Sequence, residues 1–150
     1  MPLAQLQDPA LLKTDAFING QWRSGAGRFA VTDPATGRHL ADVADVSAGQ
    51  VREAIAAAEA AWPAWRALTG KARHAALLRW FELLMQHQQD LARIMTAEQG
   101  KPLAEALGEV AYGASFVQWF AEQARRASGE MPAAPAPGQR LLVMRQPIGV

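Results

Sequence analysis

Residues that commonly carry out chemistry are few and scattered in this chain of 150 residues. The chain has no cysteine, which excludes a thiol nucleophile, a disulfide and a thiolate metal site from this stretch. Its three histidines, His39, His74 and His87, are too far apart in sequence to match a paired metal-ligand motif. We therefore interpret the histidines as surface or packing residues and expect no metal cage built on them.

The carboxylates do not indicate acid–base catalysis. We interpret Glu98, Glu105 and Glu109 as charges on helix faces, because nothing in the sequence indicates a desolvated carboxylate pair with a raised pKa. The sequence also lacks a G-x-x-x-x-G-K-[ST] phosphate loop and a G-x-S-x-G nucleophile motif. It thus predicts no catalytic and no cofactor-binding residue within positions 1–150.

One glycine motif formally matches a nucleotide-binding fingerprint. Residues 25–30 read GAGRFA, which fits G-x-G-x-x-A. That fingerprint works only between a buried strand and a helix, where the pyrophosphate meets the helix amino terminus. The flanks in this chain are a polar hairpin arm and a proline turn, so we interpret the motif as a surface turn.

Composition narrows the class of protein. Half of the residues are hydrophobic and the formal net charge is +1, so neither disorder nor a strong field for nucleic acid or anionic lipid is indicated. No stretch approaches the roughly 18 apolar residues of a membrane span, and no signal peptide pattern is present at the start. We expect a cytoplasmic protein that binds neither nucleic acid nor membranes.

The first structured part, residues 16–46, is predicted to form antiparallel strands. Asn19 and Gly20 are the residue pair that best suits a type I′ hairpin turn. The segment 33–37, DPATG, is a second turn, in which proline presets φ and glycine supplies an unusual dihedral. A strand is expected over residues 28–32, before this turn, and another over residues 39–46.

Four helices are predicted after the strands. Ser47 and Gln50 form a capping-box pattern for a first helix over residues 48–61, which Pro63 is expected to end. Thr69 is the expected cap of a second helix. The third and fourth are expected over residues 88–99, closed by Gly100, and from Pro102 to Gly129. The tryptophans in or beside these helices are expected to pack in a core. They are Trp62, Trp65, Trp80 and Trp119.

The fourth helix is predicted to pack on two sides. It carries one apolar stripe that includes Val110 and Val117, and a second with Tyr112, Phe116 and Trp119. After it, the proline-rich segment 131–138 is an extended connector. A strand is expected over residues 140–146, and a new apolar run begins at residue 148, which suits a fragment better than a finished fold.

Several strings, in order and spacing, resemble the aldehyde dehydrogenase superfamily. The resemblance covers nearly the whole chain from about residue 15. It is similar in particular to the bacterial succinate-semialdehyde dehydrogenases. The strings are FINGQW at 17–22, DPATG at 33–37, residues 57–66, MTAEQGKPLAEA at 95–106, SFVQWFAE at 115–122 and RQPIGV at 145–150.

The resemblance implies an α/β fold with an NAD(P)-binding domain, a catalytic domain and a β oligomerisation arm. In this sequence, residues 1–15 would be a tail and 16–128 the amino-terminal part of the NAD(P)-binding domain, built of antiparallel hairpins and four helices. Residues 129–147 would be the strand region of the arm, and 148–150 would start the nucleotide-binding sheet. The Ala/Pro-rich connector departs from the usual shorter polar form of the family.

The resemblance also implies a reaction. The parent protein would oxidise succinate semialdehyde to succinate with NAD or NADP, through a cysteine thiohemiacetal and a thioester that a glutamate-activated water hydrolyses. In the family both residues lie beyond position 150, so the segment alone is expected to be inactive. The parent is expected to be a homodimer or homotetramer. Two alternatives remain open: glutarate semialdehyde or another aliphatic aldehyde as the substrate, and a non-catalytic binding module.

Two sites are implied within the segment. The family lines its substrate tunnel partly with the helix that matches residues 102–127, so Tyr112 and Phe116 are candidates to face the substrate; the alternative is that both fill the core. Some relatives hold a structural monovalent cation at positions matching Thr32 and Glu98, where oxygen ligands suit a hard ion.

Overall fold

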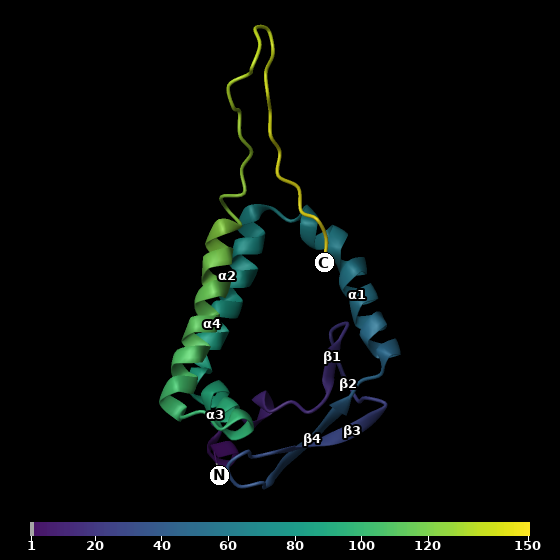
Figure 1. Cartoon of the computed structure of the whole chain (residues 1–150), viewed down its shortest axis with the longest axis vertical. Coiled ribbons are helices and arrows are strands. Elements are labelled where there is room, and N and C mark those ends of the chain that lie inside the picture. The colour runs from purple at the N-terminus through teal and green to yellow at the C-terminus, as the bar shows by residue number, and fades with distance from the viewer. Residues whose placement is uncertain (1) are drawn as a thin grey trace.

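Two hairpins, four helices and a projecting arm follow one another along the chain (Figure 1). The computed structural model describes residues 2–150. Figure 1 shows α2 and α4 side by side, α1 on the opposite side and the strands at the lower end. No helix among the described residues has the length and hydropathy needed to span a bilayer.

The first hairpin joins β1, Ala16–Ile18, to β2, Gln21–Arg23, in antiparallel register. Its turn places Asn19 at φ 50° and Gly20 at φ 77°, a combination that L residues other than asparagine and aspartate rarely adopt. The predicted hairpin turn is therefore confirmed.

The second hairpin joins β3, Gly27–Thr32, to β4, His39–Asp45. The turn between them is closed by a 2.8 Å hydrogen bond from the Gly37 N–H to the Asp33 carbonyl, and Gly37 has φ 69°. The Asp33 carboxylate accepts the N–H of Ala35 at 2.8 Å, and this bond lowers the pKa of the carboxyl group. Both strand predictions are confirmed to within one residue at each end.

Helix α1 spans Ala48–Ala67, six residues longer than the sequence predicts. Its start is as predicted, because the Ser47 hydroxyl and the Gln50 side chain form the reciprocal capping box. The predicted end at residue 61 is wrong, since Pro63 lies inside the helix. A proline removes one N–H from the helical ladder, and the residues after it hold enough helical propensity to continue for another turn.

The other helices are α2, Gly70–Gln86, α3, Gln88–Gln99, and α4, Leu103–Gln123. Thr69 caps α2 by accepting the Ala72 N–H, and Gly100 ends α3 at φ 80°, both as predicted. The predicted end of α4 at Gly129 is wrong by six residues. The helix gives way to turns after Gln123, and Gly129 instead starts the arm.

The core of the described residues is small. The side-chain cluster at its centre contains Ala92, Ala106 and Val110, where α3 meets α4, with Leu91, Met95 and Leu107 against it. The predicted core positions of the tryptophans are wrong for this structure: Trp65, Trp80 and Trp119 are exposed. Trp80 and Trp119 are more than half exposed on their helices, whereas Trp65 lines a pocket with residues 145–147 of the arm.

A buried carboxylate fixes the amino-terminal segment to α3. Asp90, in the first turn of α3, is only 3% exposed. It accepts the backbone N–H groups of Gln7 and Asp8, at 2.8 to 3.1 Å, and a bond from Arg93 at 2.9 Å. These donors stabilise the charged form and lower the pKa of the Asp90 carboxyl, with the Asp8 and Gln7 amides as the largest causes.

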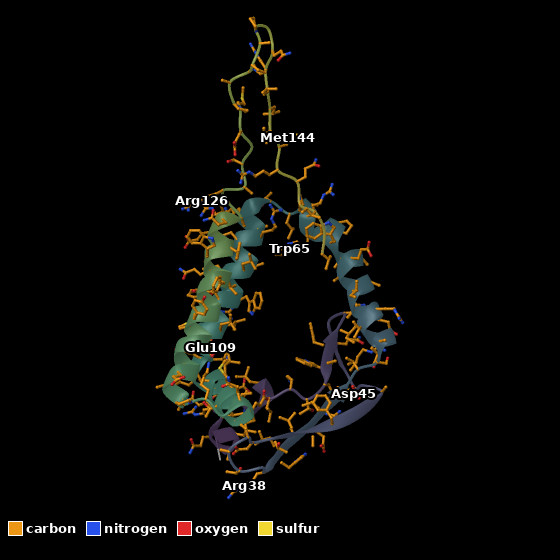
Figure 2. The ribbon with its side chains drawn as sticks, viewed as in Figure 1. Arg38, Asp45, Trp65, Glu109, Arg126 and Met144 are labelled. Atoms are coloured by element: carbon orange, nitrogen blue, oxygen red, sulfur yellow. The ribbon has the colours of Figure 1, made fainter. Side chains whose placement is uncertain are left out.

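The arm, residues 129–147, projects from the body as two extended segments that are joined by a turn at its tip (Figures 1 and 2). The strand predicted over residues 140–146 does not form; a single antiparallel bridge, Glu130 with Val143, joins the two lengths. A strand needs a continuous ladder of backbone partners, and the prolines opposite this segment interrupt it. Residues 148–150 are also not a strand, and they return to the body beside α1.

Candidate functional site

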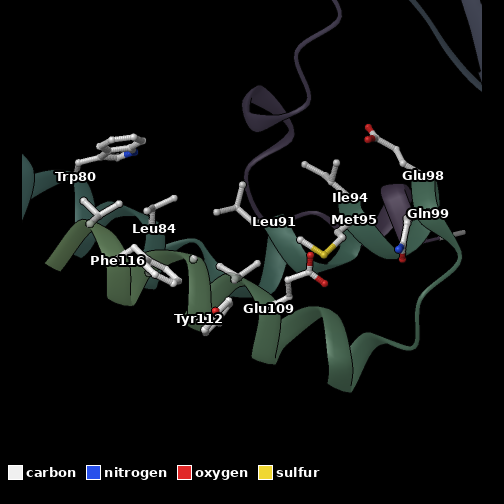
Figure 3. A pocket seen from close by; sticks show the side chains of 14 residues that line it. Trp80, Leu84, Leu91, Ile94, Met95, Glu98, Gln99, Glu109, Tyr112 and Phe116 are labelled. Carbon is white, nitrogen blue, oxygen red and sulfur yellow. The ribbon is translucent and has the colours of Figure 1, made fainter. Parts of the chain in front are cut away.

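An apolar groove of about 720 Å³ runs along α2, α3 and α4 (Figure 3). Its half-buried or buried lining residues include Leu84 of α2, Leu91 and Met95 of α3, and Val110 and Val117 of α4. Both α2 and α3 pack on α4, and the groove is lined by all three helices. The other lining residues are Trp80, Ile94, Glu98, Gln99, Glu109, Tyr112, Gly113, Ala114 and Phe116.

The two aromatic residues expected to face a substrate line this groove together. Tyr112 and Phe116 lie one helical turn apart and contact each other edge to face, with ring centroids 4.9 Å apart and planes at 85°. Tyr112 is 66% exposed and Phe116 48% exposed. Such a pair presents both apolar ring surface and a phenolic hydroxyl to whatever occupies the groove.

Polar groups gather at one end of the groove. Figure 3 shows Glu98 and Gln99 at the end of α3, and Glu109 of α4 beside Met95. Lys101, in the loop between these helices, forms an ion pair with Glu109. The pair leaves Glu98 as the uncompensated negative charge among the groove residues, so this end is the hydrophilic end of an otherwise apolar surface.

The two residues of the expected cation site lie on different elements. Thr32 ends β3, and Glu98 is in the last turn of α3. The two segments are close in space, since a Cβ added to Gly100 would be 2.9 Å from the Cγ of Pro34. The described residues contain no group of three acidic, histidine or cysteine side chains that could hold a metal ion.

The glycine motif at residues 25–30 begins in the connection between β2 and β3, and its residues 27–30 belong to β3. The predicted surface turn is therefore found only at residues 25–26, and the motif leads into a strand and not into a helix. A Cβ added to Gly25 would lie 2.2 Å from the carbonyl oxygen of Asp45, so glycine is required there for the close approach of two backbone segments.

Two of the histidines, His74 and His39, have a hydrogen-bond partner in the structure, in keeping with packing or surface roles. The Nδ1 of His74 lies 2.9 Å from the carbonyl oxygen of Ala121, and the Nε2 of His39 lies 2.9 Å from the Asp42 carboxylate. The part of the groove made by Trp80 and Met95 was not predicted from the sequence. The spacing of Leu77, Leu84 and Met85 indicates a buried stripe on α2, but it does not say that Trp80 stays beside an open groove.

The comparisons with known proteins agree with this fold. Residues 22–150 match the profile of the aldehyde dehydrogenase family. The chain is 52% identical, over 148 residues, to a glutarate-semialdehyde dehydrogenase of Pseudomonas putida. It is 50% identical, also over 148 residues, to a succinate-semialdehyde dehydrogenase (NADP(+)) of Escherichia coli K12. Each alignment covers 97% of this chain and 31% of the relative.

Solved structures show the same fold. The chain superimposes on a succinate-semialdehyde dehydrogenase from Burkholderia pseudomallei with a TM-score of 0.92 and 47% identity, covering 97% of this chain and 30% of that one. The hairpins, four helices and arm are thus a mixed α/β unit that recurs in larger dehydrogenases. This chain belongs to the aldehyde dehydrogenase family, and it spans about a third of the length of the relatives it matches.

Proposed function

We propose that this chain is the amino-terminal part of an enzyme that oxidises succinate semialdehyde to succinate with NAD or NADP. The observation that carries the proposal is the 50% identity over 148 residues to a protein named for that reaction. The cysteine nucleophile, the glutamate that activates water and the cofactor-binding residues would come from polypeptide beyond position 150. A cysteine-free segment is compatible with this arrangement.

Within this enzyme, the groove on α4 would form one wall of the substrate tunnel. Tyr112 and Phe116 line the groove and are exposed, as a wall residue must be. Their mutual edge-to-face contact fixes both rings, so they would present a rigid surface to an aliphatic aldehyde. Thr32 and Glu98 would hold a structural monovalent cation near the polar end of the groove. The end of β3 and the last turn of α3 would each supply an oxygen ligand.

The large solvent-exposed area of this chain supports the proposal that other polypeptide covers the helices in the parent protein. The described chain exposes 10661 Å² for a mass of 16.2 kDa, whereas a compact monomer of that mass exposes about 7,500 Å². The excess is comparable to the 2,000–5,000 Å² that obligate interfaces bury. We therefore propose that the catalytic part of the parent covers the α4 groove and that the arm contributes to a homodimer or homotetramer in the cytoplasm.

The decisive experiment is an assay of the natural full-length gene product with purified aldehydes. We expect oxidation of succinate semialdehyde with NAD or NADP as the acceptor, monitored at the absorbance of the reduced nicotinamide. Absence of oxidation with both cofactors would reject the proposal. It would favour a non-catalytic binding module.

Glutarate semialdehyde is the second candidate substrate. The relative of that name, from Pseudomonas putida, is 52% identical to this chain, slightly more than the succinate-semialdehyde dehydrogenase. The two substrates differ by one methylene, which changes transition-state binding by about 1–3 kcal/mol in a fitted pocket. Comparing kcat/KM for the two semialdehydes decides between them.

A further inference from the structure

Positive charge is concentrated at the end of the body from which the arm projects. Segments 62–74, 120–130 and 145–147 meet there, and they carry six basic and two acidic residues, a formal charge of +4. The whole chain has a charge of +1, so the rest of it is net negative. Such an excess of one sign attracts ligands of the opposite sign. The basic residues are Arg66, Lys71, Arg73, Arg125, Arg126 and Arg145, and the acidic residues are Glu122 and Glu130.

Two of these cations have partners within the segment. Arg73 donates to the carbonyl oxygens of Arg66 and Leu68, at the end of α1. Arg145 forms a 2.6 Å ion pair with Glu130 at the base of the arm. Both side chains therefore stabilise the junction of the helices with the arm.

Arg125 and Arg126 differ from these two. Both are exposed on the turn that follows α4, and Figure 2 shows Arg126 where the arm begins. Within residues 2–150, neither guanidinium group forms a hydrogen bond or an ion pair. Glu122 lies about one helical turn before them and pairs with neither. Two adjacent positive charges thus stay uncompensated in this part of the protein.

The carbonyl groups at the end of α4 have partners other than these arginines. Basic side chains after a helix commonly stabilise its last carbonyls. Here the carbonyls of residues 120, 122 and 123 accept backbone N–H groups at 2.8 to 3.3 Å. The carbonyl oxygen of Ala121 lies 2.9 Å from the Nδ1 of His74. The two guanidinium groups therefore remain available to a ligand.

A cavity of about 540 Å³ brings these groups together with a histidine. It is lined by His74, Glu122, Arg125 and Arg126. Because a carbonyl oxygen only accepts, the Nδ1 of His74 carries the proton that points to Ala121, and its Nε2 remains for a ligand. Nε2 accepts a hydroxyl proton in the neutral ring and donates in the charged ring. Two guanidinium groups and such a nitrogen suit the oxygens and the hydroxyl of a hydrogen phosphate.

We propose that this cavity binds a phosphate group, as the free ion or as a small phosphate monoester. Arg125 and Arg126 bind the phosphate oxygens through their N–H donors, and His74 contacts a third oxygen through Nε2. A dianion offsets the charge of both arginines, which no carboxylate of the described segment does. None of the three residues lines the groove on α4, so the inference goes beyond the proposed oxidation.

Titration calorimetry of the natural full-length protein tests the site. Inorganic phosphate and glycerol phosphate are the probes, at a constant ionic strength set with chloride, so that general screening does not change during the titration. Arg126→Gln should weaken binding roughly tenfold or more, because it removes a charged group of donors. Arg52→Gln, an equal loss of charge at an exposed position of α1, is the matched control and should leave binding unchanged. Tighter binding of glycerol phosphate assigns the site to a monoester, and tighter binding of inorganic phosphate assigns it to the free ion.

Glu122→Gln should change binding in the opposite direction. It removes the carboxylate from the cavity with little change in shape and should tighten binding by roughly threefold. A variant that had only lost its structure would not bind more tightly. No saturable binding of either probe by the unmodified protein, equal weakening by Arg52→Gln, or no tightening by Glu122→Gln would each overturn the proposal. Calorimetry measures phosphate binding and not semialdehyde oxidation, so its result is independent of the proposed function.

Discussion

At the scale of single residues, Asp90 shows how one buried charge can order a segment without secondary structure of its own. The amino-terminal residues form only short 3-10 turns, Pro2–Gln5 and Pro9–Leu11. The Asp90 carboxylate accepts the N–H groups of Gln7 and Asp8 between these turns. Carboxylates that accept backbone amides remain ionised well below their ordinary pKa.

Asp90 should make stability depend on pH in the acid range. Because its pKa is lowered in the folded state, its stabilisation is fully present above the unfolded pKa of about 3.9 and is lost as pH falls through the folded pKa. Asp90→Asn in the full-length protein should lower stability at neutral pH, and the difference from the unmodified protein should shrink as the pH falls. Urea unfolding at several pH values measures this. Glu82→Gln, at an exposed ion pair, is the control and should show little effect.

Gly113 provides a test of the groove at the same scale. It lines the groove, and an added Cβ would meet nothing within 4 Å, so the backbone at this position accepts a Cβ without a clash in this segment. If the groove is a wall of the substrate tunnel, Gly113→Leu in the full-length protein should raise the KM for the semialdehyde by on the order of tenfold.

Ala104→Leu is the matched control for that variant. Ala104 is exposed on α4 and does not line the groove. The same introduced side chain at this position should leave KM near that of the unmodified enzyme. Equal KM values for all three proteins would show that substrate does not pass along the groove.

At the scale of elements, the α2–α4 pair depends on one close backbone contact. Gly70 starts α2, and an added Cβ would be 2.5 Å from the carbonyl oxygen of Ala124, at the end of α4. Backbone atoms cannot give way as a flexible side chain does. The two helices can therefore meet at this end only because position 70 has no side chain.

The contact predicts opposite effects of one substitution at two glycines. Gly70→Ala should destabilise the full-length protein by roughly 1–3 kcal/mol, because the clash outweighs the gain in helical propensity. Gly108→Ala, inside α4 with nothing within 4 Å of the added Cβ, should stabilise it by roughly 0.5–1 kcal/mol. Denaturant unfolding gives both values. A stabilised Gly70→Ala variant would mean that the helix ends are farther apart than they are in this structure.

At the scale of the whole molecule, the segment exposes apolar side chains on several elements. Phe116, Trp119 and Phe120 are exposed on α4, Trp80 on α2 and Ile55 on α1. Among the described residues, only small ones such as Ala92 and Ala106 are fully enclosed. A stable domain of this length normally buries far more, which is why the helices need cover from other polypeptide.

Residues 1–150 expressed alone should therefore be poorly folded or aggregate. We expect a broad thermal transition and binding of a hydrophobic dye by the isolated segment, whereas the full-length protein should melt cooperatively. Calorimetry and sedimentation measure both. A sharp, cooperative transition of a monomeric 1–150 segment would contradict the requirement for cover.

Signals that act within a few residues were readable from the sequence. Asn19-Gly20, the Ser47 capping box, Thr69 and Gly100 each satisfy backbone groups of their own neighbourhood, and the structure has all of them where the sequence predicts them. Local signals did not predict the ends of α1 and α4 correctly. Pro63 did not end α1, and α4 ended before Gly129, because helix limits depend on what the last turns pack against.

The amino-acid sequence by itself determined the turns, the helix starts and the family, since these depend on residue types at short, fixed separations. Tertiary structure alone decided that Tyr112 and Phe116 share a groove with Trp80 and Met95, and that Gly25 and Gly70 sit against distant carbonyls. It also decided that Glu130 pairs with Val143 at the base of the arm. The physical reason is that such contacts join segments far apart along the chain, where no local pattern specifies which surfaces will meet.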